Sequence, residues 1–242
     1  MTARAAGIAA LALSAAAGCG GKGSATTAAT TDAAPAGGRS AASFYEQSPE
    51  PPSRSAADEA AQTRKERAAV RRRLGTRPDL KVSPRSIVGK AALDVWFTVL
   101  ERIDVELGSP LAGDPRLARL NKGQRALNTL FEVDAEVQNG GFSQFYFNSS
   151  GSFAEDVPAA ARAIGADRYA RLAEAANRVL MGGQTFAVPR ESSPRVARLE
   201  GLPEEAFARL DDAWSNPPPG EHGLDVLAAR YVRAHPHMFL GY

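Results

Sequence analysis

The chain has 242 residues, enough for one ordinary domain or two small ones, and its 44% hydrophobic and 23% charged residues are typical of a globular protein. The net charge of +2 conceals an uneven distribution, since residues 1–86 carry 13 Lys and Arg against 7 Asp and Glu, whereas residues 87–242 carry 16 against 20. The single Cys excludes an internal disulfide framework and any zinc site built from several thiolates.

Residues 1–19 are predicted to be a lipoprotein-type signal peptide. Arg4 gives a weak positive start, residues 5–17 form an apolar stretch too short for the roughly 20 residues that span a bilayer, and small residues precede Cys19. This pattern resembles a bacterial lipobox, with Ala16 in the place where Leu is usual. The resemblance implies that Cys19 is diacylated and that the protein is exported and anchored to the cell membrane by lipid. If the signal is not used, the protein stays in the cytoplasm.

Residues 20–85 are predicted to form a disordered linker, because Ala, Gly, Ser, Thr and Pro dominate this segment. It has too few large apolar residues for their burial to offset the loss of chain entropy on folding. Basic residues gather between Arg64 and Arg73, and residues 58–74 could form a polar helix. Attraction to anionic lipid headgroups would contribute about 1 kcal/mol for each basic residue. No apolar face accompanies the charge, so a solvated linker end is the favoured interpretation.

From residue 86 onward the apolar residues follow the helical period, which predicts an all-α fold: one compact domain of about six to eight helices over residues 86–242. The first helix is expected to begin at Ser86, to carry Val88 on its apolar stripe and to end at Gly108.

The second helix is expected over residues 122–138, with Asn121 and Gln124 as a capping pair and the Asn139-Gly140-Gly141 segment as its end. Its apolar stripe consists of Leu127, Leu130, Phe131 and Val137.

Five further helices are expected. One covers residues 154–164, with a kink or a later start because of Pro158, and the clearest one begins at Asp167. The others open near Pro194, Pro203 and Leu224, and residues 184–189 could form a lone short strand.

The segment around the end of the second helix is too particular to be ordinary packing. It strongly resembles a bacterial domain family of unknown function, one member of which is a DNA-mimic protein. The resemblance covers residues 120–180 and, more loosely, residues 202–239, where Leu210-Asp211 falls in a family-like place. It implies an all-α fold and provides no catalytic residues to transfer. The signature residues are Asp134, Glu136, Asn139, Gly140, Gly141, Phe142, Gln144, Phe145, Asn148 and Gly151.

The signature favours a structural corner over a ligand site. Asp134 points along the apolar stripe near a helix C-terminus, where an anion is disfavoured and a buried carboxylate needs partners. The N–H groups of residues 140–142, or an Arg from another helix, are the expected donors. Gln144 and Asn148 are expected to tie the following turn back to the helix.

Other chemistry is weakly indicated. Glu132 and Glu136 share a helix face, but no Glu-x-x-His motif follows, so a solvated face is favoured over acid/base or metal chemistry. His235 and His237 lack an evident third ligand and are predicted to be surface residues. We therefore predict no catalytic residue, no metal and no cofactor.

The sequence predicts a membrane-tethered lipoprotein that binds a protein partner of unknown identity, with no direct contact to nucleic acid. A DNA mimic needs a dense negative surface, and the excess of acidic residues here is small. Two alternatives are an envelope enzyme that uses the carboxylates of Glu132, Asp134 and Glu136, and a purely structural lipoprotein. The oligomeric state stays open.

Overall fold

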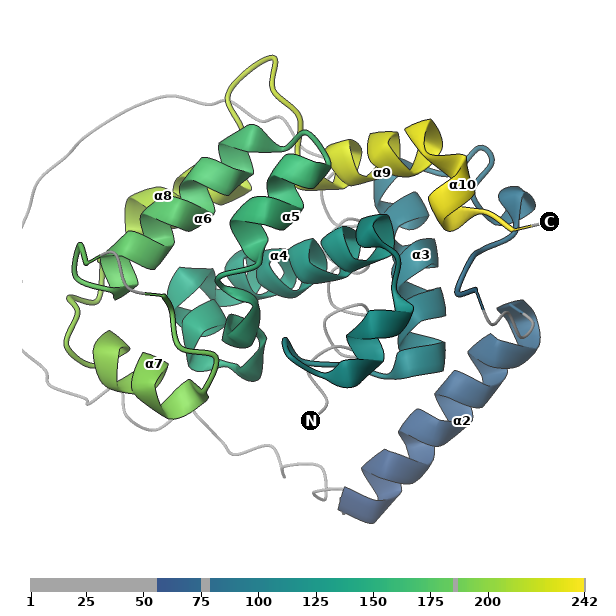
Figure 1. The fold of residues 1–242 in the computed structure, drawn as a ribbon, viewed down its shortest axis with the longest axis horizontal. Coiled ribbons are helices and arrows are strands. Elements are labelled where there is room, and N and C mark those ends of the chain that lie inside the picture. The colour runs from purple at the N-terminus through teal and green to yellow at the C-terminus, as the bar shows by residue number, and fades with distance from the viewer. Residues whose placement is uncertain (1–55, 75–78, 185–186, 242) are drawn as a thin grey trace, which may run out of the picture.

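The computed structural model describes residues 56–74, 79–184 and 187–241 (Figure 1). The predicted signal peptide with Cys19, and most of the predicted linker, lie outside the described residues.

Helices dominate the described part of the chain, which confirms the predicted all-α fold. No strand occurs in these ranges, and β-structure is limited to one parallel bridge between Val82 and Leu240. Three short 3-10 helices cover Pro84–Ser86, Pro115–Arg119 and Ser149–Phe153. The α-helices are α2 (Ala56–Leu74), α3 (Ala92–Leu107), α4 (Lys122–Phe147), α5 (Val157–Ala163), α6 (Asp167–Leu180), α7 (Ser192–Leu199), α8 (Ala208–Ser215), α9 (Leu224–Ala234) and α10 (Pro236–Phe239).

Helix α4 is the central element. It crosses the middle of the molecule, with α5 to α8 toward one end and α3, α9 and α10 toward the other (Figure 1). The predicted capping pair is present: the Asn121 side chain accepts from the Gln124 N–H at 3.0 Å, and the Gln124 side chain accepts from the Asn121 N–H at 3.1 Å. The predicted stripe is buried, and together with Trp96 of α3 it forms part of one continuous core.

The start of α3 differs from the prediction. The helix begins at Ala92 rather than at Ser86, because a 3-10 turn occupies residues 84–86 and Gly89 adopts a left-handed φ of 72°. Val88, expected on the apolar stripe, is 77% exposed. Gly108 follows the last residue of α3, as predicted.

Further along the chain, the prediction for the start of α5 is confirmed and the prediction of a short strand is wrong. Helix α5 begins at Val157, so Pro158 lies in its first turn, where a missing N–H costs nothing. This is the later start that the sequence predicts. The lone strand predicted for residues 184–189 is wrong for the described residues there, which form no strand.

The domain begins earlier than the predicted boundary at residue 86. Leu80 and Val82 are each 1% exposed, so both belong to the core. The Val82 N–H donates to the Phe239 carbonyl at 2.8 Å, and the Gly241 N–H donates to the Val82 carbonyl at 3.0 Å. The prediction therefore places the end of the disordered linker too far along the chain. The segment around residues 80–82 has no helical periodicity, but hydrogen bonds to the C-terminal segment hold it in the domain.

Helix α2 also lies within the predicted linker, and charge holds it against α3. Arg67 lies 3.6 Å from Asp104, Arg71 lies 3.5 Å from Glu106, and Arg73 pairs with Glu101. None of the side chains described in α2 is buried. Arg71 also donates to the Val105 carbonyl at 3.1 Å. The contact of α2 with the domain therefore depends largely on polar contacts of partly exposed arginines, and such ion pairs contribute roughly 0–1 kcal/mol each and weaken in salt.

We expect 0.5 M NaCl to release α2 without unfolding the core. Hydrogen exchange of the α2 amides should accelerate several-fold between 0.05 and 0.5 M salt, while exchange in α6 stays unchanged. The triple variant Arg67→Gln, Arg71→Gln, Arg73→Gln, which changes α2 alone, should show the fast exchange already at low salt. Equal protection of α2 at both salt concentrations would mean that apolar contacts hold the helix.

Within the described ranges, no helix combines the length and the apolar character needed to cross a bilayer.

Candidate functional site

The predicted end of the second helix is a sharp break inside α4. Gly140 (φ −158°, ψ 27°) and Gly141 (φ 74°, ψ −177°) leave the helical conformation, and the helix resumes at Phe142. Gly141 occupies a backbone region that only glycine adopts readily. We call residues 134–151, which surround this break, the corner.

A carboxylate from a distant helix occupies the break. The Phe142 N–H, which begins the second part of α4, donates to Asp211 Oδ1 of α8 at 2.7 Å. A Cβ on Gly141 would lie only 2.6 Å from Asp211 Oδ2, so the absence of a side chain permits this approach. Burial raises the pKa of Asp211, and the hydrogen bond from Phe142 lowers it. Asp211 therefore caps a helix N-terminus in trans, where a negative charge is favoured.

Glu136 ties the two parts of α4 to the turn that follows. Its Oε2 accepts from Gln144 Nε2 at 2.7 Å and from Asn148 Nδ2 at 2.8 Å, and its Oε1 accepts from Ser150 Oγ at 2.8 Å. Asn139 Nδ2 also donates to Gln144 Oε1, at 3.1 Å. Gln144 and Asn148 thus return the turn to the helix as predicted. The prediction that Glu136 lies on a solvated face is wrong, because helix periodicity does not show that the chain folds back over it.

Asp134 has a different partner from those that the sequence suggests. It is partly buried, and its Oδ1 accepts from Trp214 Nε1 of α8 at 2.9 Å. The N–H of Phe142, one of the expected donors, goes to Asp211 instead. Burial raises the pKa of Asp134 from 3.8 to about 6, and hydrogen bonds from Trp214 and Gln138 oppose this rise. The negative charge of Asp225 adds to it.

The raised pKa of Asp134 predicts a pH dependence of stability. Between about pH 4 and pH 6 the folded state holds a proton that the unfolded state has released, so the free energy of unfolding falls as pH rises through this window. Asp134→Asn keeps an oxygen acceptor for Trp214 and removes the charge. We expect it to be about 2 kcal/mol more stable than the natural protein at pH 8 and nearly equal to it at pH 4. Urea unfolding across this range measures the difference, and parallel pH profiles for both proteins would contradict it.

Arg195 of α7 is a functional residue of the corner that the sequence analysis missed. Its guanidinium is fully buried and donates to the carbonyls of Tyr146 (3.0 Å), Asn148 (2.9 Å), Pro189 (3.0 Å) and Arg190. Burial lowers the pKa of Arg195 below its usual value, and the charge of Glu191 acts in the opposite direction. The guanidinium therefore satisfies carbonyls at the C-terminus of α4, where the helix dipole favours a cation.

Gly151 makes room for Arg195. A Cβ at this position would lie 2.7 Å from Arg195 Nε and 2.7 Å from the Phe145 carbonyl. The sequence does not distinguish buried Arg195 from Arg198, which lies on the same helix and is only partly buried.

Aromatic rings fill the inner side of the corner. Phe142 packs edge-on against Trp214 with ring centroids 5.3 Å apart, and Phe145 lies 5.2 Å from Tyr146. The Tyr146 hydroxyl donates to Asn177 Oδ1 of α6 at 2.6 Å, so its polar end is satisfied inside the core. The signature residues thus join α4 to α6, α7 and α8.

The two carboxylates of the corner that the sequence offers for chemistry are engaged with different partners. Asp134 accepts from Trp214, and Glu136 accepts from Gln144, Asn148 and Ser150. The rings of His235 and His237 lie 6.2 Å apart, and His235 Nδ1 lies 3.0 Å from the Tyr231 carbonyl. Within the described ranges, no group of three or more His, Cys, Asp or Glu residues could hold a metal ion.

The fold and the corner define a class of protein: a small all-helical domain whose central helix breaks at a Gly-Gly pair and is held by polar groups from later helices. Residues 118–235 match the family model described as DMP19-like protein, so this part of the helical domain is similar to that family. Comparison with curated proteins gave no match, and neither did comparison with solved structures.

Proposed function

We propose that this protein is a lipid-anchored module of the cell envelope that binds a protein partner through its DMP19-like domain. The corner supports a role in binding rather than in catalysis, because its side chains hold helices together. The carboxylates of Asp134, Glu136 and Asp211 all accept hydrogen bonds from within the domain.

The observation that carries this proposal is the exposure of Phe147. This residue ends α4 and is 61% exposed, although the residues on either side of it are fixed by Arg195. An aromatic ring on a rigid support binds a partner at little entropic cost, and aromatic residues are enriched at the centres of interfaces. Phe147 therefore marks the proposed contact surface.

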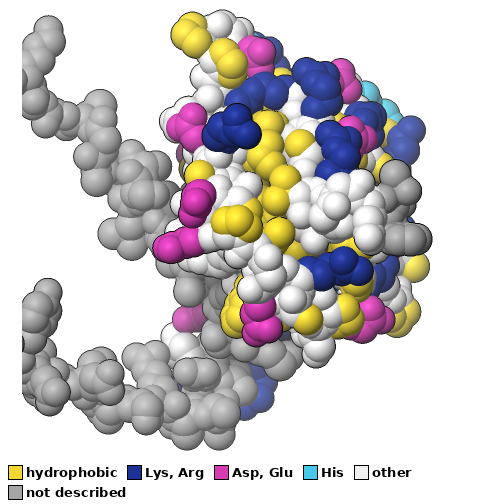
Figure 2. Space-filling view, turned by 90° about the vertical axis from the view of Figure 1, so that its left-hand side faces the viewer, with side chains coloured by type: hydrophobic (Ala, Val, Ile, Leu, Met, Phe, Trp, Pro, Cys, Tyr) yellow, Lys and Arg dark blue, Asp and Glu magenta, His cyan; other side chains and the backbone are white. Residues whose placement is uncertain are grey.

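The surface charge favours a mixed interface over imitation of DNA. On one side of the molecule, basic and acidic side chains surround a band of apolar ones (Figure 2). A mimic of DNA needs an extended acidic array, and partners that recognise 6–10 phosphates lose roughly 10³–10⁵ in affinity between 50 and 200 mM salt. For a mixed interface we expect less than a tenfold loss over the same range.

Photo-crosslinking in intact cells tests the binding role. Benzoylphenylalanine at position 147 is expected to yield one discrete adduct with a second protein. The same group at position 88 serves as the control, because Val88 is also exposed but lies far from the corner in the sequence. No adduct from position 147, or identical adducts from both positions, would contradict the proposal.

The lipid anchor is tested separately. Mass spectrometry of the mature protein is expected to find a diacylglyceryl group on Cys19 and a new N-terminus at that residue. Cys19→Ser should leave the signal uncleaved and the protein without lipid. An intact Met1 terminus on soluble protein would contradict the anchor and would favour the cytoplasmic alternative.

A further inference from the structure

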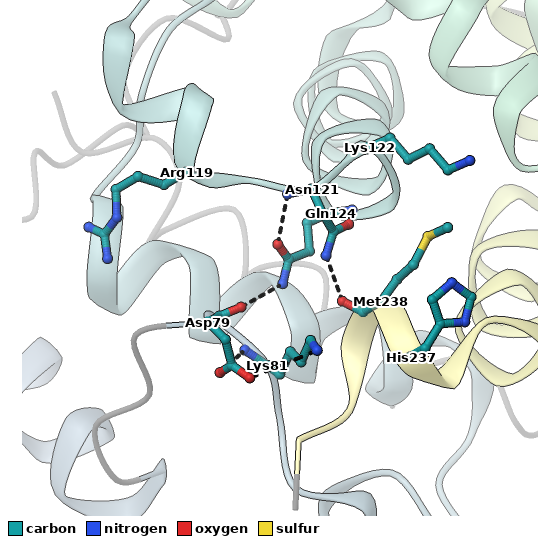
Figure 3. Close-up of a pocket in the computed structure, with 8 residues that line it drawn as sticks. All are labelled: Asp79, Lys81, Arg119, Asn121, Lys122, Gln124, His237 and Met238. Carbon is teal, nitrogen blue, oxygen red and sulfur yellow. Dashed lines mark hydrogen bonds and ion pairs between the residues drawn. The ribbon is translucent and has the colours of Figure 1, made fainter.

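A pocket of about 430 Å³ lies at the opposite end of α4 from the corner, away from the proposed contact surface. Three segments that are distant in sequence contribute to it: the chain before α3, the turn into α4, and α10 (Figure 3). Four of its eight lining residues lie outside the match to the family model and four lie inside it, so the pocket forms where the matched region meets the segments that flank it. The lining residues are Asp79, Lys81, Arg119, Asn121, Lys122, Gln124, His237 and Met238.

Hydrogen bonds fix the floor of the pocket. Gln124 is 1% exposed, and its Nε2 donates to the Leu80 carbonyl at 3.0 Å. Asn121 Nδ2 donates to the Met238 carbonyl at 2.7 Å, which joins the start of α4 to α10 (Figure 3). A Cβ on Gly123 would lie only 2.8 Å from the Phe239 ring, so the two helices are in direct contact. The segments that carry the charged side chains are therefore held in place before a ligand arrives.

The rim of the pocket is cationic. Lys81, Arg119 and Lys122 are joined by His237, and Asp79 is the only acidic residue of the lining. Lys81 Nζ lies 4.0 Å from Asp79 Oδ2, and the Lys81 backbone N–H donates to Asp79 Oδ1 at 3.2 Å. Within the described part of the chain, Arg119 and Lys122 make no ion pair, whereas the arginines of α2 that face α3 are paired with carboxylates. Arg119 and Lys122 extend on opposite sides of the floor (Figure 3). Both side chains are exposed, and both must turn toward the floor to contact one ligand.

We propose that this pocket binds a phosphate monoester or diester, with the phosphate held by Arg119, Lys122 and Lys81 and the organic part lying against Met238. A phosphate oxygen cluster accepts from several cationic donors at once, and Arg is suited to bind it through two parallel hydrogen bonds. The volume exceeds what inorganic phosphate fills, which leaves room for an organic group on the ligand. Soluble phosphate esters and the headgroups of anionic phospholipids share this chemistry.

Titration of the full-length protein with glycerol 3-phosphate, followed by amide NMR, tests the site. We expect shifts at Lys122, Gly123 and Met238 that saturate at millimolar concentration or below. The double variant Arg119→Ser, Lys122→Ser should weaken binding at least tenfold. Arg171→Ser, Arg178→Ser is the matched control, because it removes two exposed charges from α6 and should leave binding within twofold.

Two further arms identify the source of the phosphate. Sedimentation with phosphatidylglycerol vesicles, compared with phosphatidylcholine vesicles, reports on lipid headgroups. A protein without residues 1–19 is used, so that neither the lipid nor the apolar signal segment contributes. Binding to phosphatidylglycerol that is lost in Arg119→Ser, Lys122→Ser identifies a headgroup site, and binding of glycerol 3-phosphate alone identifies a soluble ester. No saturable shifts, shifts with plain glycerol, or equal weakening in the α6 control would overturn the proposal. Crosslinking at position 147 is independent of this result.

Discussion

Replacing Gly141 by alanine is expected to lower the free energy of unfolding by about 4 kcal/mol. Two costs add. The backbone at φ 74° and ψ −177° disfavours any residue with a Cβ. The new Cβ would also lie 2.6 Å from Asp211 Oδ2, so Asp211 must withdraw and leave the Phe142 N–H without its acceptor. The loss of that hydrogen bond costs about 1–3 kcal/mol in addition to the strain.

Gly108 provides a control with nearly the same backbone. Its angles are φ 72° and ψ −152°, but the nearest atoms to a Cβ there are Arg side-chain nitrogens at 3.4 Å, which can move. Gly108→Ala should therefore cost only the backbone strain, about 1–3 kcal/mol. Chemical denaturation of both variants measures the difference.

A double-mutant cycle with Asp211→Ala separates the contact from the strain. If the crowding of Asp211 contributes as we expect, Gly141→Ala costs less in the Asp211→Ala background than in the natural protein. Equal costs in the two backgrounds would show that the carboxylate does not determine why residue 141 is a glycine.

Replacing Arg195 by methionine is expected to destabilise the domain by about 4 kcal/mol, even though methionine matches much of the volume. The substitution removes the donors to four carbonyls, including those of Tyr146 and Asn148 at the end of α4. Buried acceptors that lose a charged donor cost about 1–3 kcal/mol each, and relaxation of the turn recovers part of the sum. Arg195→Lys should recover only a fraction, because an ammonium group cannot reach acceptors on several sides as a planar guanidinium does.

Arg198→Met is the matched control, because Arg198 lies on the same helix and is only partly buried. It should change the free energy of unfolding by less than about 1 kcal/mol. Hydrogen exchange adds a local measurement: Arg195→Met should accelerate exchange across residues 146–153, and Arg198→Met should not. A uniform acceleration throughout the domain would mean that Arg195 supports the core generally and not the end of α4 in particular.

Local sequence predicted most of the helices for identifiable physical reasons. The capping pair of Asn121 and Gln124 sets the start of α4, and the Gly140-Gly141 pair sets its break. These features depend on residues a few positions apart, which is the range over which backbone preferences and caps act. The start of α3 was mispredicted where a turn interrupts an apolar pattern that continues through it.

The partners inside the corner could not be predicted in this way. Asp211 lies 69 residues from Phe142, Trp214 lies 80 residues from Asp134, and Arg195 lies 49 residues from Tyr146. Many Asp and Arg residues in the chain could fill these places by type alone, and helix periodicity does not rank them.

The sequence alone determined the helical class, the position of the Gly-Gly break and the residues that carry the family resemblance. Only the tertiary structure decided that Asp211 rather than Asp134 caps the break, that Glu136 is enclosed, and that residues 80 and 82 pair with the far end of the chain. Short-range backbone preferences are present in any stretch of chain. The partner of a buried polar group exists only after distant helices have packed and removed water from both.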